Sequence, residues 1–238
     1  MKISQVIKQR IATKGPGSLW GITDFSDLSV IAVAQTLSRL VKQGTLIRVR
    51  KGIYYYPKKT VLGLSFPSVI DVISKMSSHQ KTKNYLGDTS AFNNLGLTTQ
   101  VPAQLVIMGN HQSKTIKVGN QTVIYKHRRV DHLKNASDQT VWALDAIRNI
   151  NRIPDTTAGD AIDKLIQLIR SGKLDISKLL YYGQHEAPRT RALLGAIAEQ
   201  CGYNGLRLIT TKKSLNPLTK YKLGLGRALP TASNWNIV

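Results

Sequence analysis

Side chains with catalytic or metal-binding chemistry are few and scattered in this sequence. The densest group is the segment 127–132, His-Arg-Arg-Val-Asp-His, in which His and Asp are metal ligands but the two arginines would repel a cation. Glu186 and Glu199 are the only glutamates, so a paired-glutamate acid–base site is not expected. The only cysteine, Cys201, excludes an intrachain disulfide. The sequence therefore predicts no catalytic residue, no metal site and no cofactor.

Charge is the most informative property of the composition. The 238 residues include 34 Lys and Arg against 13 Asp and Glu, a formal net charge of +21. Such an excess favours a polyanionic partner, and the absence of any run of five like charges places the charge on folded surface. The chain shows neither a signal peptide nor an apolar run of about 18 residues, so a cytoplasmic protein with no membrane contact is expected.

The first part of the chain alternates helix signals and stop signals. Apolar residues at helical spacing predict a helix that begins at Ile3 and ends before Gly15-Pro16-Gly17. Thr23 is expected to cap a short second helix. Ser29 is expected to cap a third, which ends at Gly44.

The apolar period then shortens to about two residues over 45–56, with Arg50-Lys51-Gly52 as the turn of a hairpin. Helix, short helix, helix and hairpin is the order of a winged helix-turn-helix. We therefore expect an α+β protein whose residues 1–60 form a winged helix-turn-helix DNA-binding domain.

The third helix and the hairpin supply the expected DNA contacts. With Leu37 at the centre of the buried face, the residues expected to read or flank the major groove are Gln35, Thr36, Arg39 and Lys42. Gln pairs with adenine and Arg with guanine in that groove. The residues expected to hold the phosphate backbone are Arg48, Arg50 and Lys51. The apolar first turn, Val30-Ile31-Ala32, predicts modest direct readout with contact to thymine methyl groups.

A larger mixed α/β domain is expected over residues 66–238, with a helical sub-region over 154–238. Helical patterns occur near 69–76, 88–95, 141–150, 161–169 and 191–200, and strand patterns over 105–108, 115–118 and 122–125. The last two strands are joined across Gly119-Asn120 as a hairpin.

Several stretches resemble the bacterial AbiE-type (AbiEi-like) antitoxins. They are residues 34–44, 50–57, 93–102 and 119–124. The most specific is Leu-Gly-Leu-Thr-Thr-Gln-Val-Pro over 95–102, because the first two stretches are shared by many winged regulators. The tail is similar to longer members of the group through 191–196 and 214–219.

This resemblance implies an antitoxin that binds inverted repeats in its own promoter and represses its operon. The C-terminal antitoxin-type domain would counteract a separate nucleotidyltransferase toxin, with direct contact to the toxin left open. The loop of Thr98, Thr99 and Gln100 is then a candidate surface facing the toxin or its substrate. The alternative for this loop is a turn whose side chains satisfy local backbone groups.

Two other functions stay open at this stage. In the first, the second region modifies or cleaves nucleic acid with Asp145, Asp160 or His127, although acidic residues on a helix face are by default exposed. In the second, the winged domain binds a protein in place of DNA. The charge and the basic hairpin favour a DNA-binding regulator that is not an enzyme.

Overall fold

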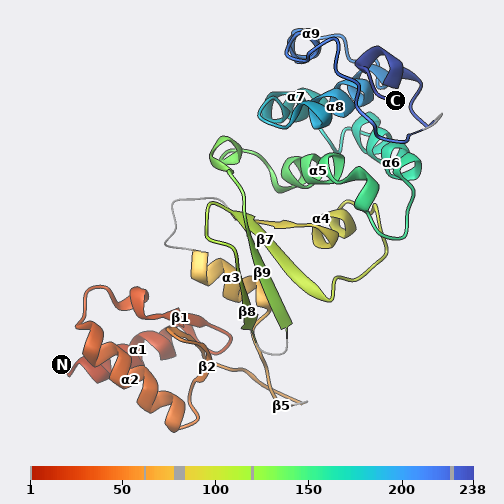
Figure 1. Cartoon of the computed structure of the whole chain (residues 1–238). Helices are drawn as coiled ribbons and strands as arrows, with labels where there is room; N and C mark the ends of the chain where they lie inside the picture. The colour runs from red at the N-terminus through yellow and green to blue at the C-terminus, as the bar shows by residue number, and fades with distance from the viewer. Residues whose placement is uncertain (1, 62, 78–83, 119–120, 226–227) are drawn as a thin grey trace. The chain divides into compact units, whose positions relative to one another are not determined.

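The computed structural model describes residues 2–61, 63–77, 84–118, 121–225 and 228–238. Its helices and strands form a mixed α+β fold. The chain divides into two compact units (Figure 1). The first unit comprises Met1–Lys81 and Ile116–Thr122, and the second comprises Thr82–Thr115 and Val123–Val238.

The first unit contains the expected order of helix, short helix, helix and hairpin. Its elements are α1 (Ile3–Lys14), β1 (Leu19–Gly21), the 3₁₀ turn η1 (Ile22–Phe25), α2 (Val30–Lys42), β2 (Ile47–Arg50) and β3 (Ile53–Tyr55). The strands form an antiparallel sheet in the order β1-β3-β2. Gly52 takes a φ of +81° in the turn between β2 and β3, where an L side chain would be strained. Strand β1 was not predicted, because three residues are too few to show a period.

The expected caps in this unit are only partly right. The η1 turn is held by Asp24, whose carboxylate accepts a hydrogen bond from the Gly21 amide at 2.7 Å, so the prediction of a Thr23 cap is wrong. Ser29 does precede α2, but within the described residues its hydroxyl makes no capping hydrogen bond. Gly44 ends α2 with a φ of +72°, which confirms the expected stop.

A single apolar core joins the helices of the first unit to one face of the sheet. Trp20 and Tyr54, which are cross-strand partners, pack with Leu37 of α2 and Ile7 of α1. The Trp20 ring stacks on Phe25 with 5.3 Å between the ring centroids. Because Trp20 and Tyr54 share this face, their neighbours along the strands point to the opposite face.

Helix α3 (Val69–Ser77) packs against β1 and β3. Lys75 of α3 donates to the Asp24 carboxylate at 2.5 Å. The helix and the short strands β4 (Lys59–Thr60) and β5 (Gly63–Leu64) therefore belong to the first unit. The expected boundary between 60 and 66 is wrong, because α3 folds back onto the earlier strands.

The second unit contains most of a four-stranded sheet in the order β6-β7-β9-β8. Its strands are β6 (Tyr85–Gly87), β7 (Gln104–Gly109), β8 (Lys114–Val118) and β9 (Gln121–His127), of which β6 was not predicted. The segment Ile116–Thr122, which contains the facing ends of β8 and β9, is part of the first unit. The predicted turn at Gly119-Asn120 lies outside the described residues.

Helices make up the rest of the second unit. They are α4 (Thr89–Asn94), α5 (Asp138–Arg148), α6 (Ala158–Arg170), α7 (Ile176–Gly183), α8 (Pro188–Gln200) and α9 (Leu206–Lys213), with 3₁₀ turns η2 (Asp131–Leu133), η3 (Ile150–Arg152) and η4 (Pro230–Trp235). Helices α4, α5, α6 and α8 confirm the prediction, whereas α7 and α9 were missed. All except α9 supply buried side chains to the same apolar core, so 154–238 is not a separate body.

The C-terminal turn η4 is fixed to α8 through Trp235, which is fully buried. Its indole nitrogen donates to Glu199 at 2.5 Å, and a methyl group on Gly195 would overlap the Trp235 ring. Helix propensity alone predicts that Gly195→Ala stabilises the protein by about 1 kcal/mol. The overlap instead predicts a destabilisation of about 1–3 kcal/mol.

Urea denaturation monitored by circular dichroism shows whether Gly195→Ala raises or lowers the free energy of unfolding. A higher unfolding midpoint for Gly195→Ala would contradict the packing of Trp235 against α8.

Candidate nucleic-acid interface

The outer face of α2 is polar, basic and exposed. Gln35, Arg39 and Lys42 all lie on it, as predicted. Ser38 and Ile31 complete the same face, and Ile31 is 72% exposed. Ser38 was missing from the predicted site, and Ile31 was predicted only as part of the apolar first turn that contacts thymine methyl groups. Positions 31, 35, 38 and 42 follow the i, i+4, i+7, i+11 spacing of one helix face.

Thr36 does not belong to this face and its predicted contact with DNA is wrong. It is only 4% exposed and packs on the inner side of α2. The buried stripe runs through Val33, Thr36, Leu37 and Leu40, the spacing of a helix that presents one apolar side to a core. Its centre lies between Val33 and Leu40 and not at Leu37, and this rotation moves Thr36 inside.

The hairpin separates the three cations that were expected to act together. Arg48 pairs across the sheet with Tyr54, so it lies on the face that carries the helical core, and its side chain is exposed at the margin. Arg50 pairs with Ile53 beyond a bulge and is half-buried, with Nη1 3.9 Å from the Met76 sulfur of α3. Lys51 is exposed in the turn. Arg48 and Lys51 are therefore free to meet a phosphate, whereas Arg50 is turned toward α3.

The segment that contains α2 and the β2–β3 hairpin has no acidic residue. The sequence contains no Asp or Glu between Leu28 and Ile70. Within the described residues, the cations Arg39, Lys42, Arg48 and Lys51 form no ion pair. In contrast, the two acids on the N-terminal side of α2 are matched, Asp27 by Arg10 at 2.5 Å and Asp24 by Lys75. Unpaired exposed cations keep their full attraction for an anion.

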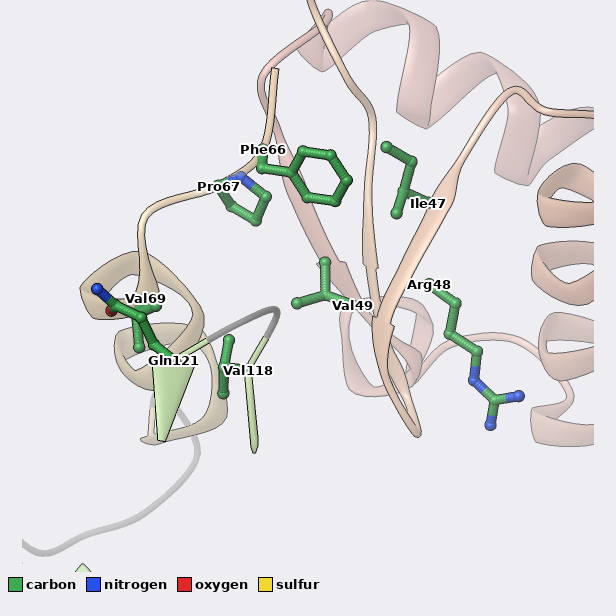
Figure 2. Close-up of a pocket in the computed structure, with 8 residues that line it drawn as sticks. All are labelled: Ile47, Arg48, Val49, Phe66, Pro67, Val69, Val118 and Gln121. Atoms are coloured by element: carbon green, nitrogen blue, oxygen red, sulfur yellow. The ribbon is translucent and has the colours of Figure 1, made fainter. Parts of the chain in front are cut away.

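The face of β2 opposite Arg48 borders a groove of about 340 Å³ in the first unit (Figure 2). Its lining residues are Ile47, Arg48, Val49, Phe66, Pro67, Val69, Val118 and Gln121. Figure 2 shows the Phe66 ring directed toward Ile47, while the Arg48 guanidinium points away from this apolar group. The lining is mainly apolar and therefore does not suit a phosphate.

Ionic side chains of the second unit converge in a buried cluster, which the sequence did not reveal. Arg148 donates to Asp145 at 2.5 Å and to Glu186 at 2.7 Å, and Arg128 donates to both oxygens of Glu186 at 3.0 Å. The Asp145 side chain is completely buried and that of Glu186 is 3% exposed. Burial also raises the pKa of the neighbouring Tyr85 to about 12.

The two carboxylates of this cluster respond differently to their surroundings. Burial raises the pKa of Asp145, and the charge of Arg148 only partly opposes that effect. Glu186 is also desolvated, but its hydrogen bonds and ion pairs with Arg148 and Arg128 outweigh burial and lower its pKa. Asp145 also accepts a hydrogen bond from the Asp88 amide at 2.9 Å, so the cluster links α5 to the junction between β6 and α4.

The residues of the enzyme alternative have structural contacts in the second unit. Asp145 is part of the buried cluster. Asp160 bonds to the hydroxyl of Thr157 at the start of α6. His127 is exposed, and its Nδ1 lies 3.1 Å from the carbonyl oxygen of His111. Among the described residues, no three His, Cys, Asp or Glu side chains are placed to hold a metal ion.

Local hydrogen bonds fix the conformation of the polar loop of Thr98, Thr99 and Gln100. Thr98 is buried, and its hydroxyl accepts a hydrogen bond from the Gln100 amide at 3.1 Å. Asn93 donates to the carbonyl oxygens of Thr98 and Gln100, each at 3.3 Å. The prediction that Thr98 faces a partner is therefore wrong, because its side chain closes a turn. Thr99 and Gln100 are exposed.

Comparison with known proteins places this α+β fold in a family. The chain belongs to a family of unknown function, DUF6088, whose model matches residues 5–176. No curated protein matches the chain. The fold is similar to the crystal structure of the RV2827C protein from Mycobacterium tuberculosis, with a TM-score of 0.51 and 11% sequence identity over 92% of this chain and 85% of that chain. No helix in the described ranges combines the length and apolar character needed to cross a membrane.

Proposed function

We propose that the first unit is a winged helix-turn-helix that binds duplex DNA. The observation that carries this proposal is the exposed face of α2, where Gln35, Arg39 and Lys42 lie in a segment without acidic residues. The order of α1, η1, α2 and the β2–β3 hairpin, with β1 added to the sheet, supports it. In this class of domain the third helical segment enters the major groove.

The proposed contacts follow from the side-chain types on each element. Gln35 pairs with adenine and Arg39 with guanine, while Ile31 contacts thymine methyl groups. Lys42, together with Arg48 and Lys51 of the hairpin, neutralises phosphates. Arg50 is left out of this set because its guanidinium lies beside Met76.

The physiological part of the proposal rests on the sequence resemblance to AbiE-type antitoxins. We propose a cytoplasmic regulator that binds inverted repeats upstream of its own operon and counteracts a nucleotidyltransferase toxin. The DNA-binding surface argued above serves such a role without any catalytic residue. The expectation about the toxin is tested separately, by co-expression of this chain with the product of the neighbouring reading frame.

The salt dependence of DNA binding tests the interface. If Lys42, Arg48 and Lys51 each neutralise one phosphate, the logarithm of the association constant falls with the logarithm of salt concentration with a slope of about −2.7 per bound copy. Fluorescence anisotropy with a labelled duplex of the upstream region measures this slope.

A slope near zero, or no binding at low salt, would remove the proposal. In that case the exposed apolar start of α2, with Val30 at 63% and Ile31 at 72% exposure, would favour the protein-interaction alternative.

A further inference from the structure

A second pocket lies wholly in the second unit, between α7, the start of α9 and the segment before α5. It has a volume of about 260 Å³ and is lined by Asn135, Ser137, Ser177, Lys178, Tyr181, Tyr182 and Arg207. Pockets for drug-sized ligands span roughly 300–1,000 Å³, so this one suits a smaller group. None of its residues takes part in the proposed duplex interface.

An exposed aromatic platform forms one wall of the pocket. Tyr181 is 46% exposed, so part of its ring is open to a ligand. The Tyr182 ring meets it edge-on with 4.9 Å between centroids, and the Arg207 guanidinium carbon lies 4.7 Å from its centroid. These two contacts come from different helices, α7 and α9, which pack together. The ring is therefore held in place before any ligand arrives.

The remaining wall is cationic and hydrogen-bonding. Arg207 and Lys178 are both exposed, and the Lys178 ammonium lies 3.7 Å from the Asp175 carboxylate, a long contact. That pair is solvent-screened and contributes little attraction. Within the described residues, the Asn135 amide and the Ser177 hydroxyl make no side-chain hydrogen bond, whereas Ser137 is committed to capping α5. Two cations and two uncommitted polar groups thus surround one fixed ring.

We propose that this pocket binds an unpaired nucleotide of single-stranded nucleic acid, with its base stacked against Tyr181 and Arg207 and its phosphate paired with Lys178. Aromatic rings beside cations are the usual means of holding unpaired bases, because every base offers a flat π-face. A purely anionic ligand would not need the exposed ring, and an apolar one would not suit the cations. Bases of a duplex are stacked on each other and cannot enter, so this ligand differs from that of the first unit.

Fluorescence anisotropy with the full-length protein tests the proposal, using a labelled oligouridine RNA and a labelled oligothymidine DNA, each of ten nucleotides. Tyr181→Ala should weaken single-strand binding about tenfold, since one stacked base is lost. Tyr181→Phe should keep the affinity because the ring remains. Arg207→Gln should weaken binding, and the matched control Lys164→Gln, at an exposed site on α6, should not.

The outcome is independent of duplex binding by the first unit. Tyr181→Ala should leave duplex affinity unchanged, and charge reversal at Arg39 and Lys42 should leave the effect of Tyr181→Ala on single strands unchanged. Equal binding of RNA and DNA supports recognition by stacking, and a preference for RNA supports added contact from Asn135 or Ser177 to the 2′-hydroxyl. Wild-type protein that binds neither oligonucleotide, or Tyr181→Ala protein that binds as well as wild type with an unchanged unfolding midpoint, would overturn the proposal.

Discussion

Replacing Arg39 and Lys42 together with glutamate should weaken duplex DNA binding by the full-length protein on the order of a hundredfold at about 0.1 M salt. Each substitution removes one favourable contact with a base or phosphate and places a negative charge beside the DNA backbone. The slope of log affinity against log salt should become about one unit less negative, because the phosphate contact of Lys42 no longer releases a counterion. Titrations of a labelled duplex at several salt concentrations measure both quantities.

The matched control is the double change Lys164→Glu and Lys173→Glu. Both lysines are exposed and belong to the second unit, so the net charge changes by the same amount without altering the first unit. Arg39 and Lys42 lie in the last turn of α2, where glutamate opposes the helix dipole by about 0.3–1 kcal/mol per residue. Circular dichroism therefore has to show folded protein. An equal loss of affinity in the control would mean that net charge, and not α2, drives binding.

Within the first sixty residues, α1, α2 and the β2–β3 hairpin could be predicted because the evidence for them is local. Periodicity gave α1 and α2, and Gly44 and Gly52 mark stops that require positive φ. The error at Thr36 arose at the next level. Which side of α2 faces inward depends on how α1 and the sheet pack against it, and a rotation of the buried stripe by less than one residue decides whether Thr36 is inside or outside.

The elements that the sequence missed are those whose stability comes from tertiary packing. Helices α7 and α9 have eight residues each, too few to form in isolation, and they are stable because they pack against α8. Strand β6 has three residues and is recognised only through its partner β7. The boundary near residue 60 failed for a similar reason, since α3 begins fourteen residues after the last strand of the sheet that it covers.

The buried ionic cluster and the tyrosine pocket could not be predicted, because their members come from distant parts of the chain. Arg128 and Glu186 are 58 residues apart, and Arg148 and Glu186 are 38 apart. Tyr181 and Arg207 belong to two helices that the periodicity did not reveal. From residue type alone, the members of the cluster and of the pocket could not be told apart from ordinary surface residues.

Replacing Arg148 with methionine should destabilise the second unit by about 3–5 kcal/mol at pH 7. The change leaves Asp145 as a buried negative charge without its cationic partner and leaves Glu186 with Arg128 alone. Removing one partner is the costly way to break a buried ion pair. Arg128→Met is the matched control. It removes two hydrogen bonds to Glu186, but Arg148 still donates to both carboxylates, so neither is left without a cationic partner and the loss should be smaller. Urea denaturation monitored by circular dichroism gives both free energies of unfolding.

The pH dependence of this difference identifies its electrostatic origin. In the wild-type protein the pKa of Glu186 is lowered, so its contribution is complete above its unfolded pKa and is lost as pH falls through the folded value. The pKa of Asp145 is raised, so its effect on the free energy of unfolding has the opposite pH dependence. The stability that this carboxyl gives below its unfolded pKa is lost as pH rises through the folded value. Without Arg148 the folded-state pKa of Asp145 should rise further and that of Glu186 should rise from its lowered value, and protonation then relieves the buried charge. The stability gap between wild type and Arg148→Met should therefore narrow as pH falls from 7 toward 4, whereas a gap caused by lost packing of the arginine stem would stay constant.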